Sequence, residues 1–549
     1  MSTRDSLANS SFAFSSTQFH RVKMGRPVDA LDIAALVIVA FCIRFLYGFG
    51  SRDKRLPPGP PTIPILGNAH QIPSQSVEKK FKEWADIYGP IYSLKIGAGT
   101  LIMLSDKRTV HDLLEKRSAI YSERPKDQQL MTALAENFAF WDANPAWRAS
   151  RKIAAHFVSP KNLDETIMAI QEAEASQLMH DLLNAPEDFF NHVKRVTASV
   201  ASIVIFGFRA PTPDSFWATC VYDAIDQINL ATTPGSYLPI DQFPVLNYVP
   251  SFLVPSKQRA KTCFNTVSSI WIEAHSRVVA RRQKGDHRMS LGDRLVSGEM
   301  KSDVKMTPRQ EANFIGTLHQ GAADTTSTMI LTNILYLAKH PWIQKKAQEE
   351  LDRVCGDRRM PTWDDFGDLP YINCIVKESM RMRPVLPTGV PVRVNRDDWF
   401  DGYLIPKDST VFCPAYNIHM NADLYPDPET YNPDRYLDRP LLAMSYAGSP
   451  DYNNRDHYSY GAGRRICVGI HLAERTQWRL TARLLWAYSI KPEIDAKGNE
   501  IEVNTDAYEV GLLCSPMPFK VRFVPRSEKH VEVIKTDFQD VEEYLKTWE

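Results

Sequence analysis

The chain has 549 residues, of which 44% are hydrophobic and 24% are charged, with 65 basic and 65 acidic side chains and zero formal net charge. This composition excludes a largely disordered chain, and the balanced charge gives no sign of a nucleic-acid partner. The length exceeds the size at which one hydrophobic core usually stops growing, so one large or two ordinary domains are expected.

The first apolar segment, residues 30–49, reads ALDIAALVIVAFCIRFLYGF, and about 20 apolar residues suffice to cross a bilayer as a helix. Asp32 and Arg44 stand towards its ends, where side chains can reach the interface. A secretory signal peptide is the alternative, but the apolar run is long and no small-residue cleavage site closes it. The segment therefore predicts an uncleaved transmembrane anchor after a leader over residues 1–29.

The eight cysteines are scattered, and none are spaced as CxxC or CxxxC pairs. A structural zinc site or a paired-thiol redox centre is therefore poorly supported. Scattered cysteines in a large chain favour reduced thiols, and hence a body that faces the cytosol. In that orientation the leader is lumenal, and Asn9 of the Asn-Ser-Ser sequence is an accessible glycosylation acceptor.

The remaining chain is expected to form one mostly helical domain. Residues 50–68 contain LPPGPPTIPILGN and predict an extended hinge, because proline fixes φ and lacks an N–H. Alternating apolar and polar residues around Gly97-Ala98-Gly99 predict a β-hairpin over residues 90–106. A helical period of apolar residues predicts long helices over residues 161–183, 258–283, 308–339, 342–354, 371–381 and 467–489.

Proline-rich irregular chain with short strands follows over residues 384–435, and a strand is expected near Val521. The predicted fold class is therefore mainly α with a small β-sheet subdomain, over residues 69–526. Residues 527–549 form a charged, helix-compatible tail. The apolar, proline-containing residues 237–255 are interpreted either as a loop folded onto the core or as a second membrane contact.

Two motifs place a carboxylate or an indole beside guanidiniums. In VKESMRMRP, Glu378 and Arg381 share one face of a helix and can form an ion pair, which Arg435 can join if the carboxylate is partly buried. In NPAWRASRK, Trp147 and Arg151 are four residues apart on a helix, so both can donate to one anion. A core tryptophan beside a surface arginine is the alternative.

The segment GTLHQGAADTTSTMI places small residues in the middle of a predicted helix, where a flat group can approach the backbone. Asp324 is a charge where core is expected, and the hydroxyl of Thr325 can donate into the adjacent space. A solvated acid beside a tolerated pair of threonines is the alternative interpretation.

The segment HYSYGAGRRICVGIHLAER surrounds Cys467 with glycines at positions 461, 463 and 469, which allow a tight turn and a close approach to a cofactor. A thiolate binds a metal when its pKa is lowered or the metal holds it. Backbone N–H groups and the helix that follows can stabilise the sulfur, and Arg465 would face a second anion. From this segment alone, Cys467 could equally be a nucleophile, a disulfide partner or a small apolar residue.

The joint order of these motifs is more specific than any one of them. A proline-rich hinge, Trp-x-x-x-Arg, Gly-Ala-x-Asp-Thr-Thr, Glu-x-x-Arg, Pro-Asp-Arg-Tyr and Gly-x-Arg-x-Cys-x-Gly occur in one chain. Over about residues 56–526 the chain resembles the haem-thiolate cytochrome P-450 monooxygenases in their membrane-anchored eukaryotic form.

The resemblance implies that Cys467 is the proximal ligand of the iron of haem b. Trp147, Arg151 and Arg465 would bind the haem propionates. Asp324 and Thr325 would line the distal side, where Thr325 would steady dioxygen and Asp324 would help to deliver protons. The resemblance further implies that Glu378, Arg381 and Arg435 form a structural network behind the haem.

Three positions depart from the family pattern. Tyr460 stands where phenylalanine is usual, and its hydroxyl needs a partner. Ala322 replaces a glycine of the dioxygen motif. Val392 stands where relatives often place a propionate-binding histidine, and Arg393 is the candidate to replace that contact.

The sequence is most similar to fungal secondary-metabolism members of the family, on cues such as EWADIYGPIYSLKIG and YSERP. This similarity implies hydroxylation or a related oxidation of a lipophilic terpenoid, polyketide or alkaloid intermediate. The expected pocket walls are residues 138–141, 318–325, 385–390 and 511–513.

The chain has no flavin or nicotinamide fingerprint, so the resemblance implies electrons from NADPH through a separate NADPH–cytochrome reductase. It also implies a single-pass protein of the endoplasmic reticulum membrane whose catalytic domain faces the cytosol. The alternatives are a haem-thiolate isomerase or dehydratase without external electrons, and a non-catalytic membrane scaffold.

Overall fold

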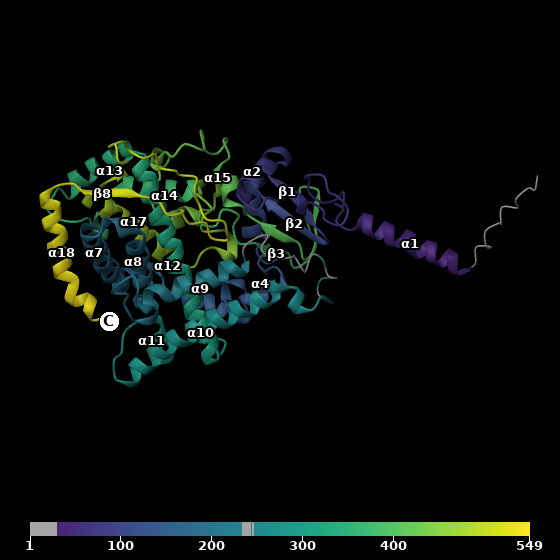
Figure 1. The fold of residues 1–549 in the computed structure, drawn as a ribbon, viewed down its shortest axis with the longest axis horizontal. Helices are drawn as coiled ribbons and strands as arrows, with labels where there is room; N and C mark the ends of the chain where they lie inside the picture. The colour runs from purple at the N-terminus through teal and green to yellow at the C-terminus, as the bar shows by residue number, and fades with distance from the viewer. Residues whose placement is uncertain (1–29, 233–242, 244–245, 247) are drawn as a thin grey trace, which may run out of the picture. The chain divides into compact units, whose positions relative to one another are not determined.

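The computed structural model of the chain describes residues 30–232, 243, 246 and 248–549 (Figure 1). They fall into two units, of which the first ends at Gly48 and the second comprises Phe49–Glu549. The predicted leader, with Asn9, lies outside the described residues.

The described part of the first unit is helix α1 (Ala30–Gly48), as predicted. The apolar side chains that the structure describes in it are exposed, among them Leu31, Leu36 and Phe41. Among the residues that the structure describes, no helix combines the length and the apolarity that a membrane crossing needs. The helix is therefore present, but its predicted role as a transmembrane span is not confirmed.

The second unit is mostly helical, and five of the six long helices predicted from the sequence are present within a few residues of their expected bounds. The sixth, predicted over residues 161–183, is divided into a short helix, a π-helical segment over Leu163–Ile167 and a longer helix that begins only at Met168. Its helices are α2 (Val77–Tyr88), α3 (Lys107–Val110), α4 (Gln128–Ala133), α5 (Pro145–Phe157), α6 (Pro160–Asn162), α7 (Met168–Asn184), α8 (Phe189–Phe206), α9 (Phe216–Thr232), α10 (Pro255–Gln283), α11 (Leu291–Val296), α12 (Pro308–Lys339), α13 (Pro341–Val354), α14 (Pro370–Met382), α15 (Ala415–His419), α16 (Ala443–Ala447), α17 (Ile470–Ala487) and α18 (Glu528–Lys546).

The strands form three small sheets, which confirms the predicted fold class of a mainly helical chain with little β-structure. The largest sheet has the order β1-β2-β6-β3, and the hairpin predicted over residues 90–106 supplies its first two strands. In that hairpin Ile96 stands opposite Gly99 across a two-residue turn. The strands are β1 (Ile91–Ile96), β2 (Gly99–Leu104), β3 (Val392–Arg393), β4 (Asp398–Phe400), β5 (Tyr403–Ile405), β6 (Thr410–Phe412), β7 (Tyr488–Pro492) and β8 (Val521–Pro525).

Helix α12 is the central element of the second unit (Figure 1). It starts with a capping box, in which the side chain of Thr307 accepts from the N–H of Gln310 and the Gln310 side chain accepts from the N–H of Thr307. Its 32 residues extend for about 48 Å. The first half packs in one apolar cluster with Trp271, and the second half packs in another with Trp486. Residues 321–325 lie in the middle of α12, and Ala323 among them belongs to the first of these clusters.

The C-terminal residues predicted to be helix-compatible do form a helix, α18. Ser527 caps its N-terminus, and the Ser527 side chain accepts a hydrogen bond from the N–H of His530. Although α18 is rich in charge, Ile534 and Leu545 are fully buried. The helix lies beside α7 in Figure 1 and contacts it. Residues 527–549 are thus part of the packed unit.

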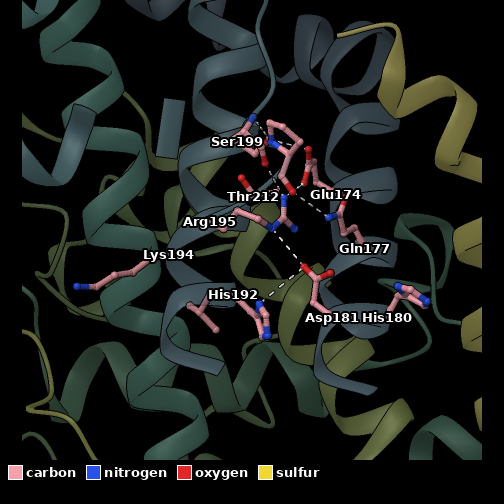
Figure 2. A network of polar contacts seen from close by, with 12 residues as sticks. Glu174, Gln177, His180, Asp181, His192, Lys194, Arg195, Ser199 and Thr212 are labelled. Atoms are coloured by element: carbon pink, nitrogen blue, oxygen red, sulfur yellow. Dashed lines mark hydrogen bonds and ion pairs between the residues drawn. The ribbon is translucent and has the colours of Figure 1, made fainter. Parts of the chain in front are cut away.

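A buried polar network joins α7, α8 and the end of the chain. Figure 2 shows Arg195 between Glu174 and Asp181, with 2.7 Å from its Nη1 to Oε2 of Glu174 and 3.2 Å from its Nε to Oδ2 of Asp181. Arg209 pairs with Glu174 at 3.0 Å and with the side chain of the last residue, Glu549, at 2.8 Å. Because Glu174 is fully buried and accepts from two guanidiniums, its charge is compensated.

Candidate functional site

The loop before α17 brings Cys467 to a fixed position. The N–H of Cys467 donates to the carbonyl of Tyr460 at 2.8 Å, which closes the loop on itself. Gly463 has φ of +61°, and a Cβ there would lie 1.9 Å from the carbonyl oxygen of Leu114. Glycine is therefore required at position 463, both for the backbone angle and for this close approach. Helix α17 begins only at Ile470, three residues after Cys467.

The thiol of Cys467 is accessible, although protein surrounds it. The residue is exposed by its accessible surface, and burial among the surrounding atoms raises the pKa of the thiol. The N–H of Gly469 and the guanidinium of Arg151 act in the opposite direction and lower the pKa of Cys467. These two groups are the electrostatic support for a thiolate.

The predicted residues Trp147, Arg151 and Arg465 come together beside this loop. Asn144 caps α5, and Pro145 begins it, so Trp147 and Arg151 follow on one face. The guanidinium of Arg465 lies 4.1 Å from the centre of the Trp147 ring. Nη2 of Arg151 donates to the carbonyl of Ile466 at 2.5 Å. The three residues that the resemblance groups as propionate ligands therefore lie close together.

Arg124, which was not predicted, is a third guanidinium of this cluster. Its Nε donates to the carbonyl of Ala139 at 2.9 Å, and its Nη1 donates to the carbonyl of Pro391 at 2.5 Å. Burial and the like charges of Arg465 and Arg151 hold its pKa well below the ordinary range of arginine. The YSERP sequence contains this arginine, but nothing in that segment indicates its burial.

The three guanidiniums form a site that suits anions. Burial lowers the pKa of Arg151, and burial with the charge of Arg151 lowers the pKa of Arg465 to about 10. Nη1 of Arg465 is buried without a hydrogen-bond partner. Within the described part of the chain, none of the three is in an ion pair with a carboxylate. A ligand with two carboxylates would supply the charge that these residues lack.

Asp324 and Thr325 lie in the middle of α12, as predicted. Thr325 donates from its hydroxyl to the carbonyl of Gly321 at 2.8 Å, and Gly321 is exposed although α12 is the central helix. A Cβ at Gly321 would meet no atom within 4 Å, so open space adjoins this turn of α12. Asp324 is buried, and burial raises the pKa of its carboxyl to about 6.

Glu378, Arg381 and Arg435 form the predicted ion-pair network. Glu378 and Arg381 on α14 are both fully buried and pair through two parallel bonds of 2.7 Å. Nε of Arg435 lies 3.4 Å from Oε1 of Glu378. Arg381 also donates to the carbonyls of His419 and Pro428, so the network fixes irregular chain far from α14 in sequence.

The departures from the family pattern have structural answers. Arg393, the candidate to replace the histidine contact, pairs with Asp142 at 3.0 Å and with Asp408 at 2.8 Å, so two carboxylates already hold its guanidinium. Val392 is buried in β3. The hydroxyl of Tyr460 accepts from Nε2 of Gln477 at 3.3 Å.

A model of the family described as cytochrome P450 matches residues 57–523. The chain is 38% identical over 529 residues to the cytochrome P450 monooxygenase yanC of Aspergillus niger, covering 94% of this chain and 98% of that protein. It is 37% identical to the cytochrome P450 monooxygenase macC of Penicillium terrestre, covering 93% and 97%. It is 36% identical to the cytochrome P450 monooxygenase patI of Aspergillus clavatus, covering 92% and 95%.

The fold, the cysteine loop and these matches define one class of protein. The chain belongs to the cytochrome P450 family and is a monooxygenase. Members of this family hold a haem iron through a cysteine thiolate, and they use dioxygen, a small-molecule substrate and a redox partner.

Proposed function

We propose that this P450 monooxygenase binds haem b through Cys467 and oxidises a lipophilic intermediate of fungal secondary metabolism. When bound, a thiolate-ligated haem would supply the redox centre at which dioxygen is activated. The observation that carries the proposal is the combination of an accessible Cys467 with an anion-deficient cluster of three buried guanidiniums.

The proposed haem contacts divide between the metal and the propionates. Cys467 supplies the sulfur, supported by the N–H of Gly469. Arg124, Arg151 and Arg465 would hold the two propionates, and Trp147 would position Arg465 through its ring. The orphaned Nη1 of Arg465 would gain a charged acceptor, which is one of the stronger classes of hydrogen bond in proteins.

The proposed distal residues hold and move a proton. Asp324 is poised for exchange near neutral pH because burial raises its pKa to about 6. The hydroxyl of Thr325 already donates to Gly321, so its oxygen is held towards the interior with lone pairs available as acceptors. Asp324 would pass protons and Thr325 would orient the oxygen atoms that receive them.

The proposed substrate is lipophilic because the residues expected to form the pocket are apolar and lie together. Phe138, Leu318, Ala322 and Leu513 come from three separate stretches of the chain, and the last three pack against the apolar cluster that contains Phe138. An apolar wall with few polar groups suits a hydrophobic ligand. The fungal origin of the similar proteins supports a secondary metabolite, of the terpenoid, polyketide or alkaloid type.

We further propose that electrons come from NADPH through a separate reductase, and that the protein is attached to the endoplasmic reticulum membrane. The exposed apolar side chains of α1 support membrane attachment, as do Tyr248 and Phe252 in the second apolar segment, which are 88% and 78% exposed. Carbonate extraction of membranes, with and without residues 1–48, tests the attachment. A glycosidase-sensitive gel shift that Asn9→Gln abolishes tests the lumenal leader.

One experiment tests the enzymatic proposal. The purified protein is reduced with a partner reductase, its carbon monoxide difference spectrum is recorded, and NADPH with candidate substrates is then supplied. The expected result is a thiolate-type Soret shift that Cys467→Ala abolishes, together with NADPH-dependent oxidation. Absence of the shift in the parent would overturn the haem assignment. Turnover without NADPH would favour an isomerase or dehydratase, and retained turnover in Thr325→Ala would remove the role given to that hydroxyl.

A further inference from the structure

Tyr460 is the first residue of the cysteine loop, residues 460–469, and it forms hydrogen bonds through both its backbone and its side chain. The backbone bond leads to Cys467 in the loop, and the side-chain bond leads to the helix that follows the loop. Its carbonyl accepts from the N–H of Cys467 at 2.8 Å. Its hydroxyl accepts from Nε2 of Gln477 at 3.3 Å. Gln477 is on α17, about two turns after the helix begins at Ile470. The chain from Cys467 through α17 to Gln477 and back through Tyr460 is therefore a closed ring.

The two partners of the side-chain bond are enclosed in the protein. Tyr460 is 9% exposed and Gln477 is 1% exposed. The ring of Tyr460 packs in a small apolar cluster with Met329 of α12 and Met380 of α14. A hydroxyl in such surroundings must have a partner, and Gln477 provides one from the same cysteine region. Either orientation of the amide gives one bond, because a phenol both donates and accepts.

Contacts from neighbouring elements determine the path of this loop, because its glycines do not restrict the backbone. Gly461 and Gly463 both have positive φ, and a third glycine, Gly469, lies two residues after Cys467. Glycines allow this path but they also leave the unfolded loop many other conformations. The bond from Gln477 fixes the first residue of the loop to the helix that follows its last residue.

We propose that the Tyr460–Gln477 hydrogen bond is a tether that positions the sulfur of Cys467 for the iron. Tyr460 and Gln477 are positioning residues, since neither side chain is assigned a contact with the haem. The inference rests on the proposed binding of haem through Cys467. It explains why the hydroxyl is present at a position where the family usually has phenylalanine.

The energetics of a buried pair give this tether a distinctive signature. Tyr460→Phe leaves the amide of Gln477 without a partner, and Gln477→Leu leaves the hydroxyl of Tyr460 without one. An orphaned buried polar group costs more than the bond itself contributes, whereas replacing both partners with apolar groups can be nearly neutral. The double variant is therefore expected to behave better than either single variant.

The test uses the full-length holoprotein and measures how fast the carbon monoxide complex loses its thiolate-type Soret signature in mild denaturant. Each single variant is expected to lose the signature about three- to tenfold faster than the parent, which corresponds to one buried neutral hydrogen bond. The double variant is expected to lie closer to the parent than either single variant does. Tyr458→Phe is the matched control, because it removes a buried hydroxyl two residues away and is expected to match the parent.

The midpoint reduction potential separates positioning from general stability. A shifted potential in Tyr460→Phe, with a thermal midpoint like that of Tyr458→Phe, supports the tether. The inference is overturned if Tyr460→Phe loses the Soret signature at the rate of the parent and has the parent's midpoint potential. It is also overturned if the double variant loses the signature faster than the parent by the product of the two single-variant factors. If Gln477→Leu does not fold, Tyr460→Phe decides alone, since it keeps the ring and its packing. A parent protein without the thiolate signature would instead overturn the proposed function.

Discussion

Asp324 is a carboxyl in the middle of a buried helix, which is a costly place for a charge. Burial raises its pKa to about 6, and the cation of Lys194 acts against this rise. A buried acid that exchanges its proton near neutral pH suits general acid catalysis better than it suits a structural role. Its position three residues after Gly321 and next to Thr325 places it beside the accessible turn of α12.

Asp324→Asn is predicted to lower product formation by about 10²-fold, because an amide cannot release and take up the proton. The measurement is product formed per NADPH consumed, with hydrogen peroxide followed in parallel. Asp223→Asn on α9 is the control, since it removes an exposed carboxylate from a neighbouring helix. Equal coupling in Asp324→Asn and the parent would contradict the role of this carboxyl.

Arg124 provides the second prediction at this scale. Arg124→Met is predicted to weaken haem binding by about 10- to 100-fold, the effect of losing a hydrogen bond to a charged group. Transfer of haem to an excess of a haem-binding acceptor protein measures this as a dissociation rate. Arg396→Met, which removes an exposed arginine from the segment after β3, should leave the dissociation rate of haem unchanged. An unchanged rate in Arg124→Met would remove this residue from the anion site.

Glu474 gives a pH dependence with a defined sign. Burial raises the pKa of its carboxyl from 4.5 to about 7. Between these pH values the folded protein keeps a proton that the unfolded chain has released, so stability falls as pH rises through this window. Above pH 7 Glu474→Gln is therefore predicted to be more stable than the parent by about 3 kcal/mol, and this gain should vanish towards pH 4.5. The measurement is the unfolding free energy of the parent, of Glu474→Gln and of the exposed control Glu532→Gln at several pH values. A difference between Glu474→Gln and the parent that does not change with pH would contradict the prediction.

The residues of the site differ in how far the sequence could predict them. Trp147, Arg151, Arg465 and Cys467 stand in short motifs whose internal spacing is meaningful on a helix or a tight loop. Arg124 was missed because the groups that surround and bond its guanidinium belong to residues distant in sequence, such as Pro391, whose carbonyl accepts from it. The partner of Tyr460 was missed for the same reason, since Gln477 lies 17 residues away on α17.

At the scale of elements, α14 shows how one helix fixes a large irregular region. Glu378 is fully buried between Arg381 and Arg435, and it accepts from the N–H of Asn432 at 2.8 Å. These bonds join α14 to the proline-rich chain that precedes the cysteine loop. Irregular chain has few backbone partners of its own, so such side-chain contacts determine its path.

Glu378→Ala is predicted to destabilise the protein by about 3–5 kcal/mol, because it leaves a buried arginine charge uncompensated. Denaturant unfolding followed by circular dichroism measures this loss. Glu349→Ala on α13 is the control, because it removes an exposed carboxylate that forms a long ion pair of 4.0 Å with Lys345. Its expected effect on the unfolding free energy is below about 1 kcal/mol. Similar losses in the two variants would argue against an uncompensated charge.

The ends of elements were predicted less well than their presence. The helix expected from residue 467 begins at Ile470, because Cys467 and Gly469 belong to the turn that presents the thiol. The same helix ends at Ala487, since Tyr488 starts β7 and pairs with Pro525 of β8. Both boundaries depend on residues outside the helical pattern, and periodicity alone contains no information about them.

At the scale of the whole molecule, the end of the chain takes part in the fold of its middle. Glu549 pairs with Arg209, and Arg209 pairs with the buried Glu174 of α7 (Figure 2). The carbonyl of Trp548 accepts from the N–H of Arg209 at 2.8 Å. The charge of residues 527–549 suggested a tail, but charge describes only the exposed face of α18. Its apolar face is set by Ile534 and Leu545, which are too few to predict burial from the sequence.

Ile534→Ala is therefore predicted to destabilise the whole second unit by about 2–5 kcal/mol, the cost of removing a large buried side chain and leaving a cavity. No residue of α18 belongs to the guanidinium cluster or to the cysteine loop, so the folded variant should keep the carbon monoxide spectrum of the parent. Glu532→Ala, an exposed change on the same helix, should leave the unfolding free energy within about 0.5 kcal/mol of the parent. If Ile534→Ala unfolded at the denaturant concentration of Glu532→Ala, α18 would contribute little to the stability of the folded unit, and its burial against α7 would have no energetic consequence.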